Sequence, residues 1–128
     1  MLKKYLVILL SISIAHAETC PSPEEIHVHH LHGWEAFDID NGTPLSRERL
    51  NVYTQSVQQF ALAEWADESP EGPGHCYYYG TQPSHTYLYA YLAKQNIIAD
   101  KSSTAWKPLG SGTMQCHSGI NECRFVEK

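Results

Sequence analysis

A run of six residues near the start of the chain contains four histidines: His27, His29, His30 and His32. If this run is a strand, His27 and His29 share one face, at a spacing of roughly 7 Å. His30 and His32 then share the opposite face. Two imidazoles at that spacing could bind Zn(II), Cu(II) or Ni(II), with a third ligand from a neighbouring strand. The candidates for this third ligand are His75, His85, His117 and Glu35.

The same histidine run has simpler interpretations. A solvated, histidine-rich segment would bind nickel or copper only adventitiously. Clustered imidazoles would also gain charge together as the pH falls through the range of about 5 to 8, with or without a consequence for function. The run therefore predicts a candidate metal site without requiring one.

Tyrosines alternate with aliphatic residues between His85 and Leu92. A period of two is typical of a strand with one aliphatic face and one phenolic face. The phenolic face would carry His85, Tyr87, Tyr89 and Tyr91. Tyr77 to Tyr79 on the preceding predicted strand, with Tyr78 as the residue selected among them, could extend this face by cross-strand pairing. Tyrosine offers apolar area and a hydrogen-bonding tip, so the row predicts a ligand-binding surface, with ordinary sheet packing as the alternative.

Motifs of the common enzyme families are absent from the sequence. It contains no G-x-S-x-G, no H-E-x-x-H and no phosphate-binding glycine loop. The charge balance is acidic, with 9 Lys+Arg against 14 Asp+Glu. Because no basic patch is present to displace counterions, a nucleic-acid partner is not expected.

The four cysteines predict disulfides rather than a zinc site. No C-x-x-C or C-x-x-H pair is present. Cys116 and Cys123 flank a polar stretch that could turn a hairpin, where facing cysteines can meet disulfide geometry. We therefore expect a Cys116–Cys123 bond and, by elimination, a Cys20–Cys76 bond.

The N-terminal residues resemble a secretory signal peptide. Lys3 and Lys4 precede an apolar stretch from Leu6 to Ile14, and Ala15-His16-Ala17 is a small-x-small cleavage site. The apolar stretch is too short to span a bilayer, and no second one follows. We expect residues 1–17 to be removed and residues 18–128 to form a single domain without a membrane span, either periplasmic or extracellular.

The elements that must position these side chains are mainly strands. Residues 26–39 are largely extended in character and end at the turn signal Asn41-Gly42. Thr43-Pro44 could begin a short helix near residues 44–56, followed by a strand from Val57 to Trp65. Further strands are expected over residues 75–79, 85–92, 113–116 and 123–126. About six strands with intervening turns predict an antiparallel sheet or small β-sandwich.

Four short segments resemble a family of small exported bacterial proteins that is catalogued only as a domain of unknown function. These segments are Cys20-Pro21, Phe60…Ala63-x-Trp65, Cys76-Tyr77-Tyr78 and Cys116…Cys123-Arg124-Phe125. The resemblance spans nearly all of residues 18–128 and implies a bacterial, disulfide-bearing export product. It implies no activity and no site residues, and the histidine run is not part of the pattern.

Three functions follow from the sequence as expectations. The first is an exported binding module that holds a protein, peptide or glycan on a tyrosine-rich sheet face. The second is an exported metal-binding protein that uses the histidine run. The third is a small secreted hydrolase with scattered catalytic residues.

Overall fold

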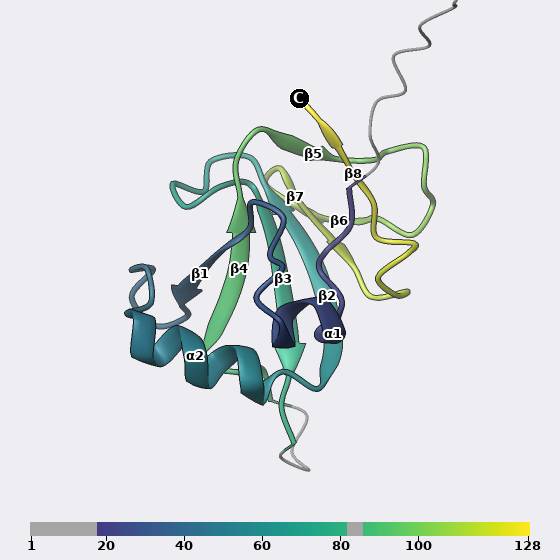
Figure 1. Ribbon diagram of the computed structural model, residues 1–128. Helices are drawn as coiled ribbons and strands as arrows, with labels where there is room; N and C mark the ends of the chain where they lie inside the picture. The colour runs from purple at the N-terminus through teal and green to yellow at the C-terminus, as the bar shows by residue number, and fades with distance from the viewer. Residues whose placement is uncertain (1–17, 82–85) are drawn as a thin grey trace, which may run out of the picture.

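The computed structural model describes residues 18–81 and 86–128, which form a mainly β domain with two short helices (Figure 1). The elements in chain order are α1 Pro23–His27, β1 Glu35–Asp38, α2 Arg47–Ser56, β2 Gln59–Ala66, β3 Gly74–Tyr79, β4 Ala90–Lys94, β5 Ile97–Ala99, β6 Lys107–Gly110, β7 Thr113–Cys116 and β8 Phe125–Glu127. Six strands form one antiparallel sheet in the order β1-β4-β3-β2-β7-β6. Strands β5 and β8 form a separate antiparallel pair. The mainly antiparallel β fold expected from the sequence is confirmed.

The large sheet has two faces of different character, because successive side chains of a strand point to opposite sides. Cys76 and Tyr78 of β3 belong to the main hydrophobic core, together with residues of α1, α2, β5 and β8. We call this the inner face. His75 and Tyr77 of the same strand point to the other side, the outer face. Figure 1 shows β1, β4, β3 and β2 side by side, with α2 running across their lower ends.

Both helices begin at local capping signals. The Ser22 hydroxyl accepts a hydrogen bond from the Glu25 backbone N–H, the Glu25 carboxylate accepts one from the Ser22 N–H, and Pro23 follows as the first helical residue. Helix α2 begins after Ser46, whose hydroxyl accepts from the Arg49 N–H. The helix expected near residues 44–56 is therefore confirmed.

The extended segment expected over residues 26–39 is wrong in its first half. Helix α1 ends at His27, a turn follows, and β1 begins only at Glu35. His29 and His32 adopt left-handed backbone conformations, with φ of 60° and 51°. Such values cannot belong to a strand. The histidines therefore do not alternate between two sheet faces.

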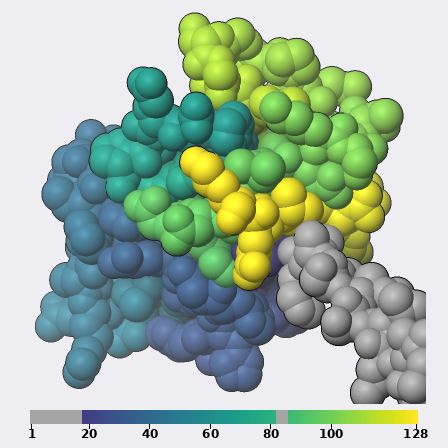
Figure 2. Space-filling model, turned by 90° about the horizontal axis from the view of Figure 1, so that it is seen from above, coloured from purple at the N-terminus to yellow at the C-terminus, as the bar shows by residue number. Residues whose placement is uncertain are grey.

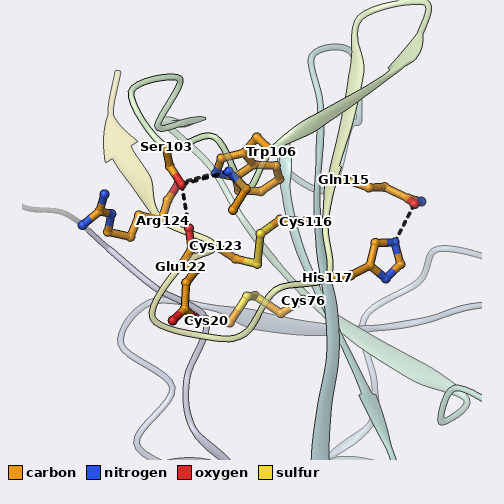
Figure 3. The surroundings of a disulfide bond; sticks show 11 residues. Cys20, Cys76, Ser103, Trp106, Gln115, Cys116, His117, Glu122, Cys123 and Arg124 are labelled. Atoms are coloured by element: carbon orange, nitrogen blue, oxygen red, sulfur yellow. Dashed lines mark hydrogen bonds between the residues drawn. A yellow bond between two sulfur atoms is a disulfide. The ribbon is translucent and has the colours of Figure 1, made fainter.

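Both expected disulfides are present, Cys20–Cys76 and Cys116–Cys123 (Figure 3). All four cysteines are buried in the main core. The residues between Cys116 and Cys123 do not form the hairpin that the sequence suggested. Strand β7 pairs with β2 and β6, whereas β8 pairs with β5. The short disulfide therefore links the two sheets.

Strand β8 also forms a β-bridge with Glu18, the first residue that the structure describes. The backbone N–H groups of Glu18 and Phe125 donate to each other's carbonyl groups at 2.8 and 2.7 Å. The Glu18 carboxylate accepts a hydrogen bond from Lys94 at 2.9 Å. In the view from above, the yellow C-terminal segment lies at the surface of the molecule (Figure 2). Among the described residues, no helix is long and apolar enough to cross a membrane.

Candidate functional site

The structure disperses the four histidines of the N-terminal run. His27 Nε2 lies 2.6 Å from the carbonyl oxygen of Val57, and His29 Nε2 lies 3.3 Å from the Thr54 hydroxyl. Two of the histidines thus bind the end of α2 or the residue just after it.

The other two histidines lie at the surface of the same turn. His30 is exposed, and its ring lies 6.5 Å from that of His32, which pairs with the Glu25 carboxylate. His75 and His117, considered above as third ligands, lie on β3 and after β7. Within residues 18–81 and 86–128, no group of three or more His, Cys, Asp or Glu side chains could hold a metal ion.

The predicted row of tyrosines is divided between the two faces of the sheet. The rings of Tyr87 and Tyr91 lie on the outer face, each 5.5 Å from the ring of Tyr77. Tyr89 packs instead beside α2, 6.2 Å from the ring of Tyr53, and its hydroxyl donates to the Arg49 carbonyl. The regular alternation fails because β4 begins only at Ala90, after a bend at Tyr89.

Two other residues predicted for this surface do not contribute to the described part of it. Tyr78 is fully buried on the inner face, and its hydroxyl donates to the carbonyl of Pro21 at 2.6 Å. It therefore belongs to the core and cannot touch a ligand on the outer face. His85 lies outside the described residues.

The outer face carries a continuous group of neighbouring aromatic rings, the outer aromatic cluster, made of Phe37, Tyr77, Tyr79, Tyr87 and Tyr91. Successive ring centroids lie 6.1 Å apart for Phe37–Tyr91 and 5.5 Å apart for Tyr91–Tyr77. The series continues through Tyr77–Tyr87 at 5.5 Å and Tyr87–Tyr79 at 5.6 Å. Phe37 and Tyr91 are buried, whereas Tyr87 is 43% exposed. The cluster is therefore closed at its β1 end and open at Tyr87.

A polar network adjoins the closed end of this cluster. His75 is buried, and its Nε2 lies 2.8 Å from the Gly72 carbonyl and 2.9 Å from the Ser69 hydroxyl. On the other side of the ring, Nδ1 lies 3.6 Å from a Glu64 carboxylate oxygen. The Ser69 hydroxyl donates to the Glu71 carboxylate at 2.6 Å. The network thus fastens the β2–β3 loop to the outer face.

Gly72 makes this loop geometry possible. Its φ of 131° is unfavourable for residues with a side chain, and a Cβ atom there would collide with the backbone of Lys94. The loop can therefore pass close to the end of β4 while its carbonyl faces His75. A glycine at this point positions the acceptor that fixes the imidazole.

Ser69, His75 and Glu64 lie next to one another in the same sequence as the nucleophile, base and acid of a serine catalytic triad. Their hydrogen bonds nevertheless argue against a catalytic role. The imidazole nitrogen that faces Ser69 also faces the Gly72 carbonyl at 2.8 Å, so it carries a proton. A nitrogen that already holds a proton cannot accept one from the serine. The Ser69 proton is directed to Glu71 instead. The arrangement therefore anchors the loop and does not activate a nucleophile.

A cavity of about 440 Å³ lies beside His75, between the β2–β3 loop and the β6–β7 turn. The loop contributes Asp67, Glu68 and Ser69, and the turn contributes residues 111–113. The cavity wall thus combines hydroxyl groups with carboxylates next to the aromatic cluster.

The phenols of Tyr77, Tyr87 and Tyr91 are neutral at physiological pH. Burial, followed by the nearby Glu71 carboxylate, raises the pKa of Tyr91 to about 12. Burial also raises the pKa of Tyr77, with a smaller effect from Glu64, and the pKa of Tyr87. The His75 imidazole, whose Nδ1 lies 3.6 Å away, holds the pKa of Glu64 below its usual value of 4.5. Neutral phenols therefore lie next to an ionised carboxylate.

Replacing Glu64 with glutamine is expected to make the domain less sensitive to acid. A carboxyl group whose pKa falls on folding stabilises the protein above its unfolded pKa, and this contribution is lost as the pH falls through the folded pKa. Chemical denaturation between about pH 7 and pH 3 should therefore show a flatter decline for Glu64→Gln than for the native protein. Glu127→Gln, at an exposed position of β8, is the control. Parallel declines for the native protein and Glu64→Gln would contradict the assigned contact with His75.

Comparison with protein-family models, with curated proteins and with solved structures finds no match for this chain.

Sequence reasoning identified part of this site and missed the rest. Tyr87 and Tyr91 were identified by their alternation with aliphatic residues. Glu64, Ser69 and Glu71 were not, because nothing in their spacing shows that the β2–β3 loop folds back onto the sheet. The sequence did contain a signal for an acidic surface in this region, because residues 50–93 contain no lysine or arginine.

Proposed function

We propose that the protein is exported and acts as a binding module that holds a segment of a partner protein on its outer sheet face. Export is supported by the basic residues, apolar stretch and cleavage site within residues 1–17. The two disulfides fit an oxidising compartment, either the periplasm or the extracellular space. The resemblance to small exported bacterial proteins points the same way.

The observation that carries the proposal is the open aromatic surface of the outer face. Its hydrophobic cluster draws buried residues only from strands of the sheet itself: Phe37 of β1 with Tyr91 and Ala93 of β4, and the half-buried Tyr77 of β3. On the inner face, by contrast, residues of both helices and of β5 and β8 complete the core. An aromatic surface of this kind is typical of a protein-binding site.

A polypeptide suits this surface better than a glycan. The rings of Tyr79 and Tyr87 are nearly parallel, with an interplanar angle of 17°, and those of Tyr77 and Tyr91 meet at 26°. Rings that stack in this way each use one flat face for a neighbouring ring, which leaves less ring face free for a ligand. A sugar would need an uncovered ring face for stacking, whereas peptide groups and side chains can pack against edges and bond to hydroxyls.

Site-specific photocrosslinking tests this proposal. A benzophenone amino acid replaces Tyr87 in one variant and Val52 in another, and each variant is expressed with its own export signal. Val52 is 59% exposed on α2, so it presents a comparable surface on the other side of the domain. We expect a discrete protein adduct from position 87 that is absent from position 52.

The captured protein is then measured directly with the purified domain. Tyr87→Ala should weaken its binding by roughly tenfold or more, as for a central aromatic contact, whereas Val52→Ala should not change it. Equal adducts from positions 87 and 52, or unchanged binding by Tyr87→Ala, would show that the outer face is not the binding surface.

A further inference from the structure

The β2–β3 hairpin carries negative charge and contains no lysine or arginine, although Lys107 of β6 lies on the same face of the sheet, opposite Gln115. Residues 50–93 include all of β2, the β2–β3 loop and β3, and they contain Glu64, Asp67, Glu68 and Glu71 but no lysine or arginine. Within the described residues, lysine and arginine form ion pairs with Glu18, Asp38 and Asp100. None of these pairs involves the four carboxylates of the outer face.

Glu64 and Glu71 lie near Tyr77 and Tyr91 of the aromatic cluster, and Asp67 and Glu68 line the cavity. Glu64 accepts a hydrogen bond from Gln115 at 3.0 Å and faces His75. The hydrogen bond from Ser69 holds the pKa of Glu71 below its usual range, so this group is ionised at neutral pH. Asp67 and Glu68 are exposed at the cavity wall. The β2–β3 hairpin therefore offers several carboxylate acceptors and no lysine or arginine of its own.

The inner side of the same domain shows how tyrosine and carboxylate are used together with an arginine. The Arg49 guanidinium lies 5.0 Å from the centre of the Tyr89 ring and donates to Asp38 at 2.7 Å. A guanidinium combines these contacts because it is planar, carries several donors and stacks on aromatic rings. On the outer face, the β2–β3 hairpin presents tyrosines and carboxylates without an arginine.

We infer that the partner segment carries a basic side chain, best an arginine, that pairs with the carboxylates of the β2–β3 loop, while another part of the segment packs against Tyr87 at the opposite end of the aromatic cluster. This inference rests on the proposed function and names the chemistry of its partner. The opposite charges would favour encounter with basic segments and disfavour acidic ones. Binding of this kind weakens as salt screens the exposed charges.

The test is an NMR titration of the purified domain with a short unstructured peptide that contains two arginines. The matched probe is the same peptide with both arginines replaced by citrulline, which keeps the shape and removes the charge. We expect the arginine peptide to shift backbone signals of residues 67–71 and 77–79 and of Tyr87, and the citrulline peptide to leave them in place. The shifts should decrease as sodium chloride is raised from about 50 to 300 mM.

A charge-neutral variant of the loop provides the second arm. Asp67→Asn combined with Glu68→Gln should weaken arginine-peptide binding about three- to tenfold, because each exposed pair contributes only modestly. Both side chains are exposed, so the fold should be retained. Glu48→Gln, at an exposed position on α2, should bind the peptide like the native domain.

The outcomes separate this inference from the proposed function. Equal shifts with the citrulline peptide, no shifts with either peptide at millimolar concentration, or shifts with a soluble oligosaccharide alone would overturn the basic-partner inference. If the protein captured from position 87 then binds with an affinity independent of salt and of the loop variant, the binding module stands and only its preference for a cation is wrong. If nothing is captured from position 87, the proposed function itself is wrong.

Discussion

Loss of the Cys20–Cys76 disulfide is expected to lower the free energy of unfolding by about 4 kcal/mol, which is a large part of the stability of a small domain. The bond closes a loop between residues 56 positions apart, so it removes much conformational freedom from the unfolded chain. It also fastens the segment before α1 to β3 in the middle of the sheet. The measurement is denaturant unfolding of Cys20→Ala/Cys76→Ala.

The second disulfide provides an internal comparison for this prediction. Cys116 and Cys123 are only 7 positions apart, so removal of their bond should cost less, about 2.5 kcal/mol. All four sulfur atoms belong to buried residues, so the cavities left by alanine are similar in kind. A larger loss from the short loop than from the long one would contradict the loop-closure explanation. It would mean instead that the link between the two sheets dominates stability.

Phe125→Ala is expected to destabilise the domain by about 3–5 kcal/mol, as is typical when a large buried aromatic side chain is removed. Phe125 has no exposed surface, and its ring packs edge-on against Trp34 at 5.5 Å and Trp106 at 5.1 Å. Phe125 lies on β8, so its side chain packs the small sheet against the main core. Thermal and chemical unfolding followed by tryptophan fluorescence would report both the lost stability and the altered surroundings of the two indoles.

Two further variants make this prediction specific. Phe125→Leu fills most of the space and should lose considerably less stability than alanine. Leu109→Ala removes an apolar side chain that is 58% exposed on β6, and it should change the free energy of unfolding by less than about 0.5 kcal/mol. Similar losses at positions 109 and 125 would show that the small sheet is not held by this ring.

The sequence predicted the class of fold because its main signals are local. Alternating and β-branched segments bounded by turn residues indicated antiparallel strands, and the two disulfides followed from cysteine spacing. Thr43-Pro44 predicted a helix in the right region, but Pro44 bridges to Phe37 and the helix begins later, after its cap residue Ser46. The capping box of Ser22 and Glu25 was equally local, but the run of histidines that follows it was interpreted as extended. The early helix was therefore missed although its starting signal was present.

The division of the tyrosines could not be derived from their spacing. A period of two places Tyr87, Tyr89 and Tyr91 on one face only if all three belong to a regular strand. Pairing of β4 with β1 begins at Ala90 and pairing with β3 begins at Leu92, and the bend before Ala90 turns Tyr89 toward α2. Register is set by partners far away in the sequence, so periodicity within one segment cannot locate the start of the strand.

What the sequence determined by itself is the β class, the pairing of the cysteines, and the presence of a tyrosine-rich, acidic stretch without lysine or arginine. What only the tertiary structure decided is which face of the sheet the helices and the small sheet cover. It also decided that the β2–β3 loop folds back to place Glu71 and Ser69 beside His75 and Tyr91. These outcomes depend on contacts between distant segments, whose energies come from burying whole faces rather than from any short pattern of residues.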